Sequence, residues 1–208
     1  MTSLRAACAA LLLLAFGAAC SSGGSPSTTP SASVPSQSSA SSAPSDAGES
    51  AGPSLPSSAA ELEALIPDEV GGVTLQKLSM RGNEFTNSGS ASAEAEEFLR
   101  NLGVATEDVS VAVGFGASPD QASTVAMFIF KAEGADSGRL TETFKRSVDA
   151  EQAQPLEWES VTVGGKQVER ASSPENNGQV NIYVTGDTLY FVATTKEEDA
   201  AEILGGLP

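Results

Sequence analysis

The chain has 208 residues, no histidine and only two cysteines, and its formal net charge at pH 7 is −16. The lack of histidine excludes every mechanism that uses imidazole as a base or a metal ligand. The excess of acidic residues disfavours binding to nucleic acids and to anionic lipid head groups, because both carry the same sign of charge.

The first 20 residues have the pattern of an export signal. Arg5 follows the positively charged amino terminus, and residues 6–16 form an apolar run centred on four consecutive leucines. This run is too short for a membrane-spanning helix, which needs about 20 apolar residues. A short apolar run that ends in small residues is typical of a signal peptide that is removed after export. No Arg-Arg pair precedes the run, so we expect export through the general secretory route.

The end of this run, Phe16-Gly17-Ala18-Ala19-Cys20, resembles the lipobox of bacterial lipoproteins. The resemblance implies cleavage before Cys20 and a diacylglyceryl thioether on its sulfur. It therefore implies a protein held at the outer face of the cell membrane, since two or more acyl chains anchor stably where one binds reversibly. The alternative is an ordinary secretory signal in which Cys20 stays an unmodified thiol. With Cys8 removed and Cys20 lipidated, we expect no disulfide framework, thiol nucleophile or cysteine zinc site.

We predict three parts. They are a signal peptide at 1–19, a disordered tether at 20–58 that begins at the Cys20 whose lipidation the resemblance implies, and a single domain at 59–208. Residues 21–58 hold 16 serines and 6 prolines without any Lys or Arg. They bury too little apolar surface to offset their ordering entropy. O-glycosylation is the alternative use of such a Ser/Thr/Pro mixture. The domain has 25 acidic and 10 basic residues, and about 150 residues suffice for one hydrophobic core.

Within the domain, period-2 patterns predict strands and period-3.6 patterns predict helices. The predicted strands span residues 73–80, 109–115, 125–130, 158–163, 166–171, 180–185 and 188–194. Four helices are predicted. The first and last follow capping boxes at Ser58–Glu61 and Thr195–Glu198, the second has residues 94–97 in its first turns, and the third starts at Asp136 or Ser137. Gly103 is placed to end the second of them. Residues 81–92 and 174–178 are predicted loops.

Two features of the strands bear on the fold. Residues 125–130 are apolar on both faces, which indicates a central strand covered on each side. Gly164-Gly165 and Gly186-Asp187 stand between pairs of strands and predict tight hairpins. The fold class predicted is α+β, with a mainly antiparallel sheet and helices packed on one face.

An internal similarity links the two halves of the domain. Residues 70–79 align without gaps on residues 163–172, with four identical positions and a Gly-Gly pair in each. Two further strands and a helix follow each copy. This predicts a duplicated β-β-β-α unit, with repeats at about 67–150 and 156–208. Chance remains the alternative, because Gly-Gly turns beside valine are common.

Carboxylates are the remaining candidates for acid–base chemistry. Glu157 and Glu159 are two apart on a predicted strand and share a face, and Glu94 and Glu97 share one side of a predicted helix. A glycosidase needs two acids about 5–9.5 Å apart. The simpler interpretation of each pair is a solvated acidic surface.

No motif assigns a catalytic residue, a cofactor or a metal. Gly114-Phe115-Gly116 begins a dinucleotide fingerprint, but Pro119 stands where the third glycine belongs. No Asp-x-Asx-x-Asx loop for calcium occurs. The oxygen donors in residues 175–177 and at Asp187 are explained by turn geometry.

These observations leave three hypotheses for function. The first is a lipid-anchored, non-catalytic binding or interaction module, which we favour because the usual catalytic side chains are missing. The second is a carboxylate-only glycosidase that acts on envelope carbohydrate. The third is a structural envelope protein without a small ligand. The sequence does not identify a protein partner or an envelope ligand, and it predicts membrane attachment through Cys20 alone.

Overall fold

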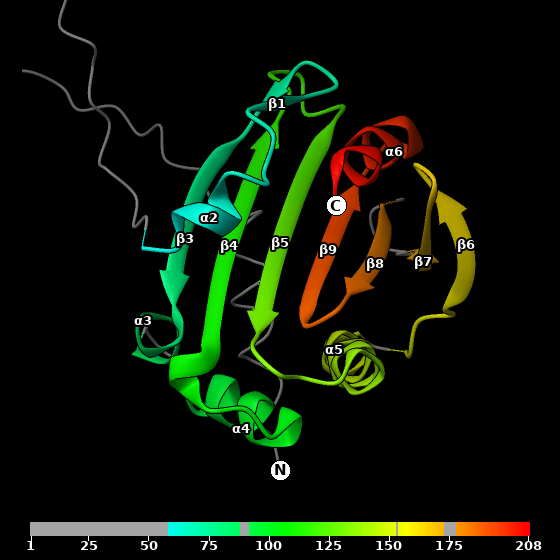
Figure 1. Cartoon of the computed structure of the whole chain (residues 1–208). Coiled ribbons are helices and arrows are strands. Elements are labelled where there is room, and N and C mark those ends of the chain that lie inside the picture. The colour runs from blue at the N-terminus through cyan, green and yellow to red at the C-terminus, as the bar shows by residue number, and fades with distance from the viewer. Residues whose placement is uncertain (1–57, 88–91, 153, 173–177) are drawn as a thin grey trace, which may run out of the picture.

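A single large sheet organises the domain (Figure 1). The computed structural model describes residues 58–87, 92–152, 154–172 and 178–208, so the predicted signal peptide, Cys20 and almost all of the predicted tether lie outside the described residues. Every strand of the large sheet pairs antiparallel with its neighbours. In spatial order the strands are β3 (Gln76–Arg81), β4 (Val109–Ala117), β5 (Thr124–Ala132), β9 (Thr188–Thr194), β8 (Gln179–Thr185), β7 (Lys166–Ser172) and β6 (Glu159–Val163). The predicted α+β class with a mainly antiparallel sheet is confirmed.

The remaining elements are helices and one short hairpin. The helices are α2 (Ala60–Glu63), α3 (Gly82–Asn87), α4 (Ser92–Leu102), the 3₁₀ turn η2 (Thr106–Asp108), α5 (Ser137–Glu151) and α6 (Glu197–Gly206). Strands β1 (Glu69–Val70) and β2 (Val73–Thr74) pair with each other in a separate two-stranded sheet.

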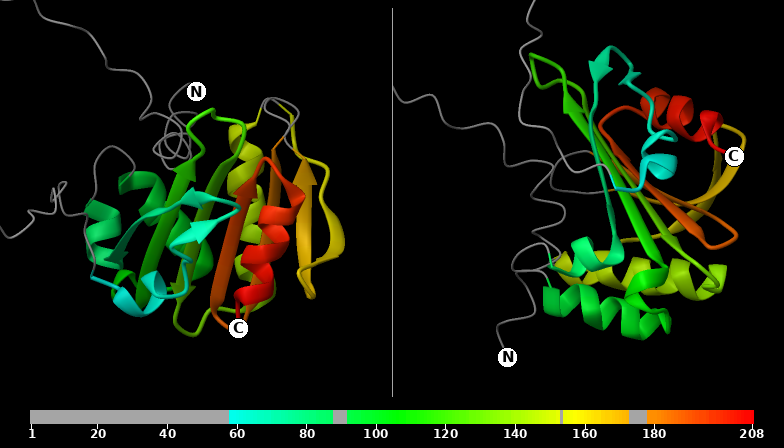
Figure 2. Two further views of the ribbon diagram at one scale, coloured as in Figure 1. Left: turned by 90° about the horizontal axis from the view of Figure 1, so that it is seen from above. Right: turned by 60° about the vertical axis from the view of Figure 1, so that its left-hand side comes forward.

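Helices cover both faces of the large sheet (Figure 2), so the prediction of helices on one face is wrong. One face carries α2, α6 and the β1–β2 hairpin over a core that includes Met127 and Ile129 of β5. The other face carries α3, α4 and α5 over a core that includes Phe130 and Ala132 of the same strand. The reason lies in β5, which is apolar on both sides and needs cover on both.

The second of these cores is built around aromatic side chains. Phe130 is fully buried and meets Phe98 of α4 edge-on, with ring centres 5.4 Å apart. Phe144 of α5 lies 6.0 Å from Phe128 and 5.4 Å from Phe191. Edge-to-face, stacked and tilted ring pairs of this kind add to the stabilisation from area burial. They fix α4 and α5 on this face of the sheet.

The two Gly-Gly hairpins have the same local geometry. Gly71 and Gly72 have φ of 54° and 80°, and Gly164 and Gly165 have φ of 56° and 81°. Consecutive positive φ values are those of a type I′ turn, which glycine adopts without strain. The paired residues also correspond, since Val70 pairs with Val73 in one hairpin as Val163 pairs with Lys166 in the other.

Strand order repeats between the halves, but helix placement does not. In the first half β3 pairs with β4 and β4 with β5, and in the second β7 pairs with β8 and β8 with β9. The helices that close the two units pack on opposite faces, because α5 contributes to one core and α6 to the other. The two halves therefore share their strand pairing and differ in the face that the closing helix covers, and the duplication itself stays a prediction.

Both predicted capping boxes are wrong, because their hydroxyl groups bond elsewhere. The N-cap of α2 is Ala59 without a side-chain cap, and the Ser58 hydroxyl instead accepts a bond from the Arg81 backbone N–H at 3.0 Å. The N-cap of α6 is Lys196, also without a side-chain cap. The Thr195 hydroxyl accepts from the Thr124 backbone N–H at 3.1 Å.

Residues 82–87 form a helix where the sequence predicted a loop. Phe85 of α3 is buried and packs edge-on against the Phe130 ring at 6.4 Å. The Thr86 hydroxyl donates to the Gly82 carbonyl at 3.0 Å. Tertiary contact of one aromatic residue thus stabilises a short helix in a polar stretch with little helical periodicity. The predicted loop at 174–178 lies almost entirely outside the described residues.

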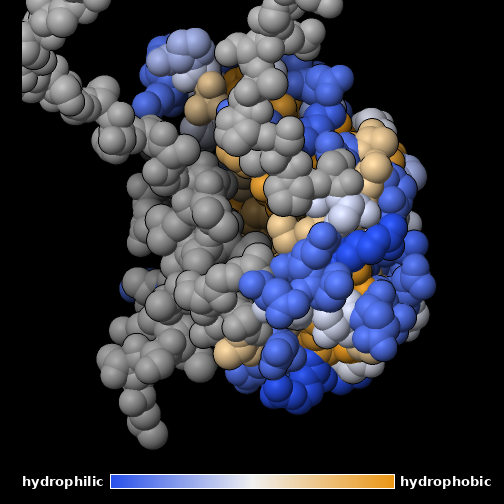
Figure 3. All heavy atoms as spheres, turned by 90° about the vertical axis from the view of Figure 1, so that its left-hand side faces the viewer, coloured by the Kyte–Doolittle hydropathy of each residue, from blue (hydrophilic) through white to orange (hydrophobic). Residues whose placement is uncertain are grey.

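The surface on the β3 side of the molecule is predominantly hydrophilic where grey atoms do not cover it (Figure 3). Hydrophobic residues show between the hydrophilic ones in smaller areas. This distribution agrees with the large excess of acidic residues in the chain.

Candidate functional site

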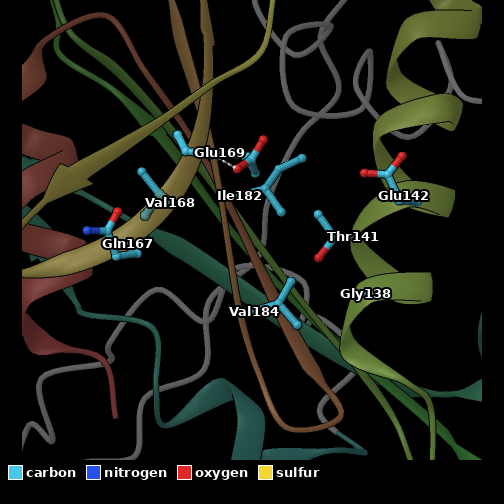
Figure 4. A pocket seen from close by; sticks show the side chains of 9 residues that line it. Gly138, Thr141, Glu142, Gln167, Val168, Glu169, Ile182 and Val184 are labelled. Atoms are coloured by element: carbon cyan, nitrogen blue, oxygen red, sulfur yellow. Dashed lines mark hydrogen bonds between the residues drawn. The ribbon is translucent and has the colours of Figure 1, made fainter.

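An open depression of about 460 Å³ lies between α5 and strands β6, β7 and β8. Its volume is within the range of about 300–1,000 Å³ that is usual for small-molecule sites. The lining comes from α5 on one side and from β6, β7 and β8 on the other, and consists of Gly138, Thr141, Glu142, Ser160, Gln167, Val168, Glu169, Ile182 and Val184. Figure 4 shows Thr141 and Glu142 projecting from α5 toward the β8 side chains Ile182 and Val184.

Glu169 is the best-connected polar side chain of the depression. The Lys145 ammonium of α5 donates to Glu169 Oε2 at 3.0 Å, and the Ser160 hydroxyl of β6 donates to Glu169 Oε1. Lys145 also lies 3.9 Å from a carboxylate oxygen of Glu142 and 5.5 Å from the centre of the Trp158 ring. One carboxylate thus joins a helix to two strands.

The hydrogen bond from Ser160 and then the hydrogen bond from Lys145 lower the pKa of Glu169 below its ordinary value. Burial opposes them, and the charge of Lys145 adds a lesser lowering effect. A carboxylate with a lowered pKa is a poor general acid and a weak general base near neutral pH. The arrangement therefore suits binding better than proton transfer.

Local sequence explains why Lys145 and Glu169 meet on the face of the sheet that carries the depression. On β7, successive side chains point to opposite faces of the sheet, so Glu169 reaches Lys145 on one face. Arg170 points to the other face and donates to Glu197 of α6 at 3.0 Å. On α5, Lys145 lies one turn after Thr141 on the same side of the helix. Helix α5 is itself fixed at its start by Asp136, whose side chain accepts from the Arg139 backbone N–H at 2.9 Å.

A second group of contacts holds the connection between α5 and β6. Asp149 Oδ1 accepts hydrogen bonds from the Trp158 indole N–H and from the Leu156 backbone N–H, each at 3.1 Å. These bonds place Trp158 beside Lys145. The position of the β6 wall relative to α5 is therefore set by side chains of α5 itself.

The carboxylate pairs proposed from the sequence are not in this depression. Glu157 and Glu159 are both exposed and neither contributes to its lining. Glu97 is exposed on α4, and the side chain of Glu94 lies outside the described residues. Asp187 accepts a hydrogen bond from the Thr188 hydroxyl at 3.1 Å, which agrees with the turn interpretation.

Cys20 and residues 175–177 lie outside the described residues. Within the described ranges, no group of three or more acidic side chains lies close enough together to hold a metal ion. In the same part of the chain, no helix is long and apolar enough to cross a membrane.

Sequence reasoning missed Lys145 and Glu169. The two residues stand 24 positions apart, and only the packing of α5 over β7 brings them together. The one local signal was the spacing of Glu142 and Lys145, which are three apart on a helix and can pair. That spacing indicates an exposed ion pair and gives no sign of a depression.

Comparison with known proteins identifies no relative. No protein-family model, no curated protein and no solved structure matches the chain at a significant level. The function is therefore argued from the site alone.

Proposed function

We propose that the protein is a lipid-anchored module at the outer face of the cell membrane that binds a ligand in the depression between α5 and β6–β8. The anchor part of the proposal is supported by the lipobox-like residues 16–20 and by the Ser/Pro-rich tether that follows them. The binding part is supported by the depression itself, which combines an apolar floor at Ile182 and Val184 with a polar rim.

Binding is favoured over catalysis by the state of the polar groups. Glu169 has a lowered pKa because Ser160 and Lys145 donate to it. Lys145 donates to that carboxylate at 3.0 Å, so the two side chains already satisfy each other. The hydroxyl of Ser160 points at a weak base, and a serine nucleophile needs a stronger one to be activated.

The glycosidase alternative has one observation in its favour. Glu142 and Glu169 line opposite walls of the same depression. A catalytic pair would need one carboxyl with a raised pKa to act as the acid, whereas the pKa of Glu169 is lowered. Turnover of an envelope polysaccharide that is lost in Glu142→Gln would establish the alternative and contradict a purely binding role.

The binding proposal is tested by a ligand screen with a blocked depression. A Cys20→Ser chain, which stays soluble if Cys20 carries the anchor, is screened by thermal shift against amines, carboxylates and sugars. Gln167→Trp places a large ring at the exposed rim. Gln76→Trp is the matched control, because Gln76 is also exposed and lies on the opposite edge strand, β3.

We expect at least one compound to bind the parent chain and Gln76→Trp equally and to bind Gln167→Trp at least about tenfold more weakly, through loss of apolar contact and access. A ligand whose affinity is the same in all three chains would bind outside the depression and contradict the proposal.

A further inference from the structure

Each side chain with a hydroxyl or amide donor that lines the depression already donates at least one hydrogen bond. The Thr141 hydroxyl donates to the Ser137 carbonyl at 2.9 Å, and the Ser160 hydroxyl donates to Glu169. The Gln167 side-chain nitrogen donates to Thr162 Oγ1 at 3.0 Å. What the rim offers to a ligand is therefore mainly acceptor oxygens, since a hydroxyl or amide that donates elsewhere can still accept.

The charged groups at the rim also favour a cation. Glu142 and Glu169 are both carboxylates, and Lys145 is the basic residue that pairs with both. One ammonium between two carboxylates leaves a formal balance of −1. The Glu142 side chain is 68% exposed, so it can turn toward a ligand without losing a buried contact. The excess of acidic residues in the whole domain raises the local concentration of cations further.

The floor of the depression is suited to methylene groups. Both Ile182 and Val184 stand on β8 beneath the polar rim. Ile182 is only 2% exposed, so Val184, which is half-buried, supplies most of the accessible apolar surface. A long amine buries its aliphatic stem on apolar surface while its charged end stays at a polar edge. The apolar floor therefore suits the aliphatic stem of such an amine, and the acceptor oxygens of the rim suit its ammonium group.

We propose that the depression binds a primary ammonium on an unbranched alkyl stem, with the ammonium at Glu142 and Glu169 and the stem on Ile182 and Val184. This inference rests on the proposed binding function of the depression and names the class of its ligand. A carboxylate or phosphate would face acceptors and negative charge, and a neutral polyol would find few donors. The alkylammonium comes from one of two sources, a free aliphatic amine or a lysine side chain of a peptide.

The test uses three probes with the same five-carbon stem and different head groups. The Cys20→Ser chain is titrated with pentylamine, 1-pentanol and pentanoate, and the amide signals of Gly138, Thr141 and Gln167 are followed by NMR. We expect pentylamine to shift these signals and to bind at least about tenfold more tightly than pentanol, because charge-assisted hydrogen bonds are the stronger kind. Pentanoate should bind most weakly.

Variants separate the role of the carboxylates from loss of folding. Glu169→Gln and Glu142→Gln should each weaken pentylamine binding by about tenfold, while pentanol binding changes little. If Glu169→Gln folds poorly, Glu142→Gln still tests the role of the carboxylates, because Glu142 is exposed and its substitution should not disturb folding. Glu157→Gln, which removes an exposed carboxylate outside the depression, should leave pentylamine binding unchanged.

The outcomes distinguish this inference from the function on which it rests. Equal binding of pentylamine and pentanol at these signals would overturn the ammonium specificity and leave the binding site in place. No change at these signals with any of the three probes would overturn both. A lysine-containing tripeptide amide added as a fourth probe identifies the source, since tighter binding than pentylamine indicates a peptide ligand and weaker binding a free amine.

Discussion

Lys145 Nζ and Glu169 Oε2 lie 3.0 Å apart and join the middle of α5 to β7. The Lys145 side chain is 18% exposed and the Glu169 side chain 28% exposed, so the pair is more shielded from solvent than the other ion pairs of the surface. Because α5 and β7 are opposite walls of the depression, this pair sets the width of the site as well as the position of the helix.

The first prediction concerns the pH dependence of this pair. The pKa of Glu169 is lower in the folded chain than its ordinary value of 4.5. Its stabilisation is therefore fully present above about pH 4.5 and is lost as the pH falls through the folded-state pKa. Glu169→Gln should lower the free energy of unfolding by about 1–2 kcal/mol at pH 7. The difference from wild type should shrink below pH 4.5, as measured by urea denaturation.

The control is an ion pair that is open to solvent. Lys131 and Glu133 lie 3.7 Å apart, with side chains 37% and 67% exposed. Glu133→Gln should change stability by less than about 0.5 kcal/mol at any pH. If the two variants behaved alike at pH 7, the pair at the depression would be an ordinary surface contact.

The second prediction compares neighbouring glycines in one turn. Gly164 and Gly165 both have positive φ, so alanine at either position is strained by about 1–2 kcal/mol. A Cβ at Gly164 would also lie 2.5 Å from the Ala201 carbonyl oxygen and 2.6 Å from the Gly205 nitrogen, whereas a Cβ at Gly165 meets nothing within 4 Å. Gly164→Ala should therefore destabilise by about 2 kcal/mol more than Gly165→Ala, as measured by denaturant unfolding.

The same pair of substitutions in the other hairpin, at Gly71 and Gly72, should show an intermediate loss of stability at the crowded position. A Cβ at Gly71 would overlap Asp199 Oδ1, and a Cβ at Gly72 would be in open space. A side-chain carboxylate can turn away more easily than backbone, so Gly71→Ala should rank between Gly164→Ala and Gly72→Ala. Equal losses at Gly71 and Gly164 would show that Asp199, which is buried and accepts from the Ser123 hydroxyl at 2.9 Å, is as rigid as backbone.

These glycines show which parts of the fold the sequence can predict. A Gly-Gly pair between alternating residues predicts a hairpin, because the turn depends on two adjacent φ angles and on little else. Asp136 as the N-cap of α5 and Gly103 at the end of α4 are predictable for the same reason, since their partners lie within a few residues. Turns and helix ends of this kind depend on neighbouring residues, so the sequence predicts them.

A prediction from local sequence fails where a side chain bonds to a group far away in the sequence and not to its near neighbours. Ser58 and Thr195 have the spacing of capping boxes, yet each hydroxyl bonds to a backbone N–H that is remote in sequence. The face on which a helix packs also depends on residues far away in the sequence. Strand β5 is apolar on both sides and so needs cover on both, but its sequence does not indicate which helix covers which side. The Lys145–Glu169 pair depends on that choice, so the depression was not predictable.

The third prediction concerns the start of the folded domain, which the sequence placed near Ala59. Ser58 donates its backbone N–H to the Ser79 carbonyl at 3.1 Å, and its hydroxyl bonds both Glu84 and the Arg81 backbone N–H. A chain that begins at Ala59 loses these bonds. It should melt about 2–4 °C lower than one that begins at Ser57, and Ser58→Ala in the full chain should reproduce part of the loss.

This comparison also tests the predicted tether. A chain that begins at Ser57 should melt at the same temperature as the chain that begins at Ser21, because residues 21–56 have too few apolar groups to pack. A drop of several degrees on removing residues 21–56 would mean that this segment contributes to the folded domain.

The last prediction concerns the anchor. We propose that Cys20 of the lipobox-like sequence accepts the diacylglyceryl group, and each buried methylene of such chains contributes about 0.8 kcal/mol to membrane binding. Wild-type protein should sediment with membranes and stay there in high salt, because the attachment is apolar and the domain is acidic. Cys20→Ser should move the protein to the soluble fraction, while Cys8→Ser, which changes the other cysteine within the predicted signal peptide, should leave it on the membrane. If wild type and Cys20→Ser were both found in the soluble fraction, the export signal would be an ordinary secretory one and Cys20 an unmodified thiol.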